Sequence, residues 1–188
     1  MHILWDFDGT LFNTYPIYQK LMKEVLPDRS EQEILAHIKI SFTHAFSYFH
    51  MTVSQIRAFR DLMHQVPAKA VQPFDGLENV LSSAEKHVIM THNNRHDVLQ
   101  VLKYHQLDSY FNDIVAYEDG FPKKPDPASY VYLDRKYGID LVIGDRLLDI
   151  ISGRKIGSRT CLFQNRQPGA DFYLEDYREF FNVINNNF

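Results

Sequence analysis

Two carboxylates close to the N-terminus are the first residues whose types and spacing could do chemistry. Asp6 and Asp8 follow a short apolar run, residues 3–5, and precede a turn at Gly9. Apolar residues bounded by a glycine turn predict a buried strand, and side chains two residues apart on a strand point to the same side. Two carboxylates in one small volume repel each other unless a cation or a shared proton relieves the repulsion. The stretch therefore predicts a site for a divalent metal ion.

Polar side chains also follow three later apolar segments. Thr91 ends one segment, Lys124 follows a loop after a second, and Asp145 and Asp149 follow a third. If these segments are parallel strands, ligands collect beyond their carboxyl ends. Three carboxylates suit Mg²⁺, a hard cation that takes oxygen ligands, while a hydroxyl and an ammonium group would hold a phosphate. A remaining carboxylate can attack phosphorus and form an aspartyl-phosphate, which divides one difficult hydrolysis into two steps.

An alternation of strands and helices after residue 76 explains how these side chains would come together. Apolar runs predict strands at residues 87–91, 113–116, 141–143 and 159–163. Helical spacing predicts helices at residues 77–85, 97–105, 127–137, 147–156 and 173–184. Continuous apolar strands separated by helices favour a parallel sheet covered on both faces. The predicted fold is α/β, with a Rossmann-like three-layer core.

The stretch from residue 14 to residue 75 has a different character. Apolar residues recur at helical spacing in four segments: Tyr15–Leu26, Ser30–Ile40, Phe42–Phe49 and Ser54–Gln65. Pro67 and Pro73 interrupt the helical pattern. We therefore expect a small all-helical cap domain at residues 14–75, inserted after the first strand, and a core domain formed by residues 1–13 and 76–188.

The composition argues against several classes of protein. The chain has 188 residues, is 45% hydrophobic and carries a formal net charge of −4, with no dense run of Lys or Arg. This length suffices for one well-buried core with an appendage, and we expect neither a nucleic-acid nor a membrane partner. The single cysteine, Cys161, precludes an internal disulfide framework and suits a reducing compartment. The chain reaches Asp6 too early for a secretory signal, so a cytoplasmic protein is expected.

Four motifs, in the same order along the chain, resemble those of the haloacid dehalogenase (HAD) superfamily, in the subgroup similar to phosphoglycolate phosphatase. They are Asp6-Phe7-Asp8-Gly9-Thr10-Leu11, Val88-Ile89-Met90-Thr91, Lys123-Lys124-Pro125-Asp126-Pro127 and Val142-Ile143-Gly144-Asp145-Arg146-Leu147-Leu148-Asp149-Ile150. The resemblance covers nearly all of the chain except the helical insertion. It implies a Mg²⁺-dependent phosphatase that acts on a small phosphorylated metabolite, phosphoglycolate or a similar compound.

The resemblance also implies a role for each matched side chain. Asp6 would be the nucleophile and a ligand of Mg²⁺. Asp8 would act as general acid and then general base, and its backbone carbonyl would touch the metal. Thr91 and Lys124 would bind the transferring phosphoryl group, with Lys124 also neutralising charge on the nucleophile. Asp145 would complete the metal site, and the fourth-motif Asp149 would support it directly or through water.

Two positions depart from the family pattern. His92 stands directly after Thr91, where family phosphatases often have Asn, and we expect His92 among the phosphate-binding residues. Arg146 follows Asp145 in place of a small hydroxyl residue. Neither departure removes a catalytic group, but both leave the contacts with the substrate open.

Other functions are compatible with the same residues. A phosphomutase resembling β-phosphoglucomutase shares all four motifs and would isomerise a sugar phosphate. A phosphonatase would need a lysine in the insertion, and Lys20, Lys23 and Lys39 keep this alternative open. A response-regulator receiver also uses Asp, Thr, Lys and Mg²⁺, although its Lys comes last along the chain. A non-catalytic binding module that retains the fold is a further alternative, and the sequence leaves the oligomeric state open.

Overall fold

The computed structural model describes residues 1–184, which divide into two compact units. One unit consists of residues 1–12 together with the chain from residue 73 onward, and the other consists of residues 13–72. The first division lies one residue before the predicted domain boundary, and the second lies three residues before it. Residues 185–188, the end of the predicted core domain, lie outside the described residues.

The larger unit is built on a six-stranded parallel sheet in the order β3-β2-β1-β4-β5-β6. Its strands are β1 (His2–Trp5), β2 (Lys86–Met90), β3 (Phe111–Val115), β4 (Leu141–Gly144), β5 (Arg159–Phe163) and β6 (Phe172–Leu174). Strand β1 lies in the interior of the sheet, and its residues Ile3, Leu4 and Trp5 are completely buried. A continuous apolar run is what a parallel strand with both faces covered requires.

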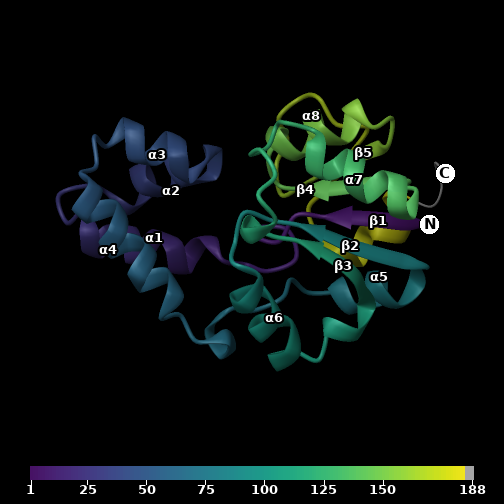
Figure 1. The fold of residues 1–188 in the computed structure, drawn as a ribbon, viewed down its shortest axis with the longest axis horizontal. Coiled ribbons are helices and arrows are strands. Elements are labelled where there is room, and N and C mark those ends of the chain that lie inside the picture. The colour runs from purple at the N-terminus through teal and green to yellow at the C-terminus, as the bar shows by residue number, and fades with distance from the viewer. Residues whose placement is uncertain (185–188) are drawn as a thin grey trace. The chain divides into compact units, whose positions relative to one another are not determined.

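Helices cover both faces of this sheet (Figure 1). Helices α5 (Leu77–Ser83) and α6 (Arg95–Tyr104) lie on one face, and α7 (Ala128–Tyr137) and α8 (Leu147–Lys155) lie on the other. The chain runs outward from β1 through β2 to β3 and then returns to β4 on the opposite side of β1. In open α/β sheets, ligands bind beyond the carboxyl ends of the strands at such a reversal. The predicted Rossmann-like α/β core is confirmed.

The pairing register aligns the ends of the three central strands. Trp5 lies opposite Ile89 on β2 and opposite Ile143 on β4. The backbone amide of Asp6 then donates a hydrogen bond of 2.9 Å to the carbonyl of Ile143. The residues that follow these positions therefore leave the sheet at one level, which brings the polar ends of β1, β2 and β4 together.

The end of the chain differs from the prediction of one helix at residues 173–184. Residues Phe172–Leu174 form strand β6, in which Tyr173 lies opposite Leu162 of β5. The chain becomes helical only after this strand, in a short 3₁₀ turn at residues 177–179 and in α9 (Phe180–Val183). The helix prediction was wrong at its start because β5 would otherwise present an unpaired edge of backbone groups. The spacing of apolar residues within one segment does not show that a distant strand, here β5, pairs with it.

Residues 13–72 form an all-helical unit with a core of its own. Its helices are α1 (Tyr15–Val25), α2 (Glu31–Ile40), α3 (Phe42–Tyr48) and α4 (Val53–His64), so the four predicted helices are confirmed. Their buried apolar side chains pack in one cluster: Tyr15, Tyr18, Met22, Leu26, Ile34, Ile38, Ala45, Phe49, Met51 and Phe59. Within residues 1–184, no helix has both the length and the apolar character that a bilayer crossing would need.

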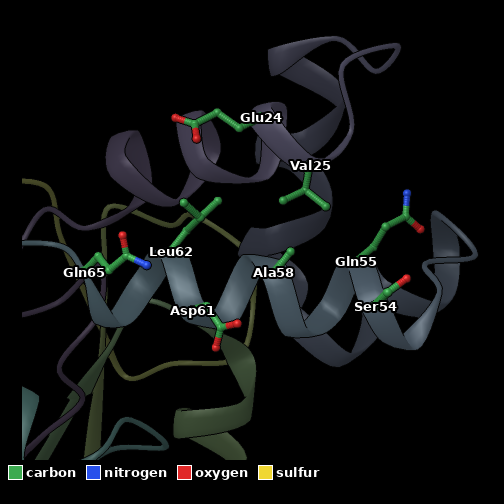
Figure 2. Close-up of a pocket in the computed structure, with 8 residues that line it drawn as sticks. All are labelled: Glu24, Val25, Ser54, Gln55, Ala58, Asp61, Leu62 and Gln65. Carbon is green, nitrogen blue, oxygen red and sulfur yellow. The ribbon is translucent and has the colours of Figure 1, made fainter.

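An open groove of about 580 Å³ lies between α1 and α4 of the helical unit (Figure 2). It is lined by Glu24, Val25, Ser54, Gln55, Ala58, Asp61, Leu62 and Gln65. Val25 and Leu62 contribute apolar groups to its lining, and two carboxylates and two amides contribute polar groups. None of the predicted catalytic residues belongs to the helical unit or lines the groove.

The chain leaves and re-enters the larger unit at neighbouring points. Phe12 and Pro73, the last and first residues of that unit at the two crossings, form an antiparallel bridge. In the helical unit, the amide of Asn13 donates a hydrogen bond of 2.9 Å to the carbonyl of Gln72. The insertion therefore begins and ends on paired backbone segments.

The buried His87 forms a hydrogen bond with Trp5, the residue directly before Asp6. His87 on β2 is 2% exposed, and its Nδ1 accepts a hydrogen bond of 2.9 Å from Nε1 of Trp5. Its Nε2 therefore carries the proton and donates to the carbonyl of Leu81, also at 2.9 Å. This pair of bonds requires the neutral ring, and burial lowers the pKa of His87 to about 4.

We expect this histidine to make the protein less stable in acid. In the unfolded chain, His87 binds a proton as the pH falls below its ordinary pKa of about 6.5. In the folded protein, His87 stays neutral until the pH approaches its lowered pKa of about 4, so protonation favours the unfolded chain. Linkage then gives a loss of about 2–3 kcal/mol between pH 7 and pH 4.5. Urea unfolding followed by the fluorescence of Trp5, the single tryptophan, measures it. In a His87→Gln variant, the acid-induced loss should be smaller by this amount, and an equal loss in both proteins would contradict the assignment.

Candidate active site

Asp6 lies directly beyond β1 and is only 2% exposed. Each of its carboxylate oxygens faces a cation: Nζ of Lys124 is 2.7 Å from Oδ1, and a terminal nitrogen of Arg146 is 3.4 Å from Oδ2. Burial acts to raise the pKa of Asp6, but the charges of Lys124 and Arg146 outweigh it and hold the pKa below its usual value. Asp6 is therefore ionised at neutral pH, which is the form that a carboxylate nucleophile requires.

Lys124 is a buried cation with every donor in use. Its Nζ lies 2.7 Å from Oδ1 of Asp6, 2.7 Å from Oδ1 of Asp149 and 2.8 Å from the carbonyl of Met90. An ammonium group has three N–H donors, so these contacts fix its position. Burial acts to lower the pKa of Lys124, but Asp149 and Asp6 raise it above the usual value. Lys124 therefore stays charged beside Asp6, whereas the adjacent Lys123 is exposed.

Asp149 is completely buried and pairs with the ammonium group of Lys124. Besides Lys124, its Oδ1 accepts a hydrogen bond of 3.1 Å from the hydroxyl of Tyr130, and its Oδ2 accepts one of 3.3 Å from the amide of Arg146. The absence of a side chain at Gly144 makes room for it, because a Cβ there would lie 2.4 Å from Cβ of Asp149. Tyr130 was not among the predicted site residues, since its position on α7 resembles that of any apolar core residue.

Three of the predicted metal ligands come together. Asp6, Asp145 and Asp149 are all buried, and each offers an oxygen within 4.8 Å of the others. A further polar contact holds the backbone here, because Asn165 donates a hydrogen bond of 2.7 Å from Nδ2 to the carbonyl of Asp145. Clustered carboxylate oxygens are the donors that a hard divalent cation takes. The donor set therefore fits the divalent metal that the family resemblance implies.

Asp8 and Thr91 are linked through a residue that the motifs do not single out. The Oδ2 atom of Asp8 accepts a hydrogen bond of 2.7 Å from Nδ2 of Asn93. The backbone amide of Asn93 donates to Oγ1 of Thr91 at 3.1 Å. The signal in the sequence is an asparagine two positions after Thr91, one position later than the family pattern. Asn93 therefore holds the carboxyl group predicted to transfer protons.

His92 is placed against the lysine loop. Its Nε2 accepts a hydrogen bond of 3.3 Å from the backbone amide of Lys124, so a neutral ring carries its proton on Nδ1. Burial, with the nearby charges of Lys124 and Arg146, lowers the pKa of His92 to about 3. His92 is therefore uncharged at neutral pH and supports Lys124. The expected contact of His92 with phosphate stays a prediction. The neutral ring could make it only through its Nδ1–H donor.

Comparisons with known proteins identify the family to which the chain belongs. The family described as haloacid dehalogenase-like hydrolases matches the chain over residues 3–163, a stretch that contains every predicted site residue. The pyrophosphatase PpaX of Bacillus pumilus (strain SAFR-032) is 30% identical over 173 residues, which cover 84% of this chain and 80% of that protein.

Solved structures share the fold. A hydrolase from Streptococcus pneumoniae TIGR4 is 27% identical with a TM-score of 0.64, and the match covers 87% of this chain and 92% of that one. A predicted phosphoglycolate phosphatase from Haemophilus somnus 129pt is 18% identical with a TM-score of 0.76, and covers 96% of each chain. The parallel sheet, the ionised carboxylate beyond its central strand and the match over most of the sequence lead to one conclusion: the chain belongs to the haloacid dehalogenase-like hydrolase family.

Proposed function

We propose that the chain is a Mg²⁺-dependent phosphatase that hydrolyses a small phosphomonoester through an aspartyl-phosphate on Asp6. The observation that carries this proposal is the buried, ionised Asp6, held at 2.7 Å by the immobile charge of Lys124 and clustered with two further carboxylates. The names of a pyrophosphatase relative and of a structural neighbour, a predicted phosphoglycolate phosphatase, also favour phosphoryl transfer to water. The substrate class that we propose is a small phosphorylated metabolite.

The residues of the site divide the reaction into two steps. In the first, a carboxylate oxygen of Asp6 forms a bond to phosphorus while the bond to the ester oxygen breaks, and Asp8 gives its proton to the leaving oxygen. In the second, Asp8 takes a proton from water as the water oxygen bonds to phosphorus. The bond between phosphorus and Asp6 then breaks, which releases phosphate and restores the carboxylate. Asn93 keeps the carboxyl group of Asp8 oriented for both transfers.

Electrostatics must supply most of the rate enhancement, because phosphate-monoester hydrolysis is among the slowest uncatalysed reactions. Asp6, Asp145 and Asp149 would hold Mg²⁺, whose positive charge stabilises the negative charge of the phosphoryl group. Lys124 maintains the ionised form of Asp6, and Thr91 would donate its hydroxyl to a phosphoryl oxygen.

The proposal is tested by measuring phosphate release from a panel of phosphoglycolate, pyrophosphate, sugar phosphates and p-nitrophenyl phosphate. We expect release that needs Mg²⁺, is abolished by EDTA and returns when Mg²⁺ is restored. Isomerisation of a sugar phosphate without net phosphate release would indicate a mutase. Tight binding of a phosphorylated compound without any turnover would indicate a binding module, and either result would contradict the proposal.

A further inference from the structure

Arg146 contacts the carboxylates that would hold the metal. Its terminal nitrogen lies 3.4 Å from Oδ2 of Asp6, and its Nε lies 3.6 Å from Oδ1 of Asp145. The side chain is only 16% exposed, so its charge is poorly screened by solvent. A guanidinium group and a divalent cation therefore require the same two carboxylates.

Only one of the two cations at the cluster can make room. The side chain of Lys124 is completely buried, and its three donors are all used within 2.8 Å. The side chain of Arg146 is 16% exposed, and these two contacts of its guanidinium are longer than the usual 2.7–2.9 Å of a charge-assisted hydrogen bond. Because its dissociation breaks weaker contacts, Arg146 is the cation that can leave.

The backbone of Arg146 is held by hydrogen bonds that do not involve its guanidinium. Its amide donates to Oδ2 of Asp149 at 3.3 Å, and its carbonyl accepts from the amide of Asp149 at 3.0 Å. These two bonds fix the start of α8. The side chain of Arg146 can therefore leave Asp6 and Asp145 without breaking the contacts between its backbone and Asp149.

The charges of the cluster are compatible with such an exchange. Three carboxylates are opposed by Lys124 and Arg146, which leaves one net negative charge in a buried site. When the guanidinium leaves, two negative charges remain, and they match a divalent cation. Conversely, a guanidinium that has to be displaced weakens the binding of that cation.

We propose that Arg146 is a tethered counter-ion that occupies the metal-facing side of Asp6 and Asp145, and that Mg²⁺ binds by displacing its guanidinium. This inference rests on the proposed function, in which Mg²⁺ binds the acidic cluster. It adds a regulatory property to that site. The carboxylates stay paired when Mg²⁺ is scarce, and a higher free Mg²⁺ concentration is needed to fill the site.

The test is the dissociation constant of Mg²⁺, measured by isothermal titration calorimetry without substrate. We expect Arg146→Ser to bind Mg²⁺ roughly fivefold more tightly than the wild type, as the loss of a partly buried competing ion pair implies. Arg146→Lys, which keeps the charge, should stay close to the wild type. Arg154→Ser is the matched control, because Arg154 lies on α8, the helix that Arg146 precedes, is exposed and pairs with Asp171 at 3.8 Å.

The outcomes separate this inference from the function on which it rests. Unchanged or weaker Mg²⁺ binding by Arg146→Ser, with normal binding by the wild type, would overturn the exchange and leave the phosphatase proposal intact. Equal tightening in Arg154→Ser would also overturn it, because a general charge effect would then explain the gain. Absence of Mg²⁺ binding in the wild type would overturn the metal assignment itself.

Discussion

Asp6→Asn is expected to abolish phosphate release while the fold is retained. Asparagine keeps the shape of the side chain and one oxygen that can accept a hydrogen bond from Lys124. Its amide is not a nucleophile toward phosphorus, however, so no aspartyl-phosphate forms. We expect kcat to fall at least about 10³-fold, because loss of a catalytic nucleophile removes the covalent route altogether.

The measurement is phosphate release with the best substrate of the panel, together with mass spectrometry of acid-quenched protein to detect a phosphorylated Asp6. Asp108→Asn is the matched control, because Asp108 is exposed and precedes β3, at the end of the strands away from the site. This control should keep wild-type turnover. Turnover undiminished in Asp6→Asn would sink the aspartyl-phosphate mechanism.

Lys124→Met is expected to remove activity and also to destabilise the protein strongly. The substitution keeps an unbranched side chain but leaves two buried carboxylates, Asp6 and Asp149, without the ammonium group that lies 2.7 Å from each. Removing one partner of a buried ion pair costs about 3–5 kcal/mol, because the remaining charge is uncompensated. Urea unfolding at pH 7 should show a loss of this size.

The loss should depend on pH in a definite direction. In the wild type, the lowered pKa of Asp6 gives stability that is present above its unfolded pKa and is lost as the pH falls through the folded value. Without Lys124 this contribution is missing, so the difference between the two proteins should be largest near pH 7 and should narrow in acid. Lys123→Met is the control, because its exposed side chain should contribute little. Equal losses in both variants would contradict the assignment of Lys124.

The parts of the site that follow strand ends could be predicted from sequence. Asp6 and Asp145 end apolar runs of β1 and β4, and parallel pairing brings such ends together whatever the loops do. Lys124 was predicted from its motif. The sequence could not show that partners from three other segments would take up all three of its N–H donors. The strand β6 was missed because its partner lies outside its own segment.

The supporting contacts could not be predicted because they join distant segments. Asn93 reaches Asp8 across 85 positions of the chain, and Tyr130 reaches Asp149 across 19. Their geometry depends on loop lengths and on the depth of each helix against the sheet. Local spacing contains neither quantity, so Tyr130 is indistinguishable from a core aromatic until its hydroxyl partner is known.

The paired backbone at the two crossings has a consequence for how the protein can change. Phe12 bridges Pro73, and Asn13 bonds to Gln72. The two ends of the helical insertion are therefore adjacent, so the insertion is a closed loop of the chain. The entropic cost of closing such a loop, expressed as a free energy, rises only slowly with loop length, by about 0.6 kcal/mol for each doubling. Insertions of different size or sequence can therefore be exchanged at this junction with little penalty to the sheet. The carboxylate chemistry and the helical module are free to evolve at separate rates.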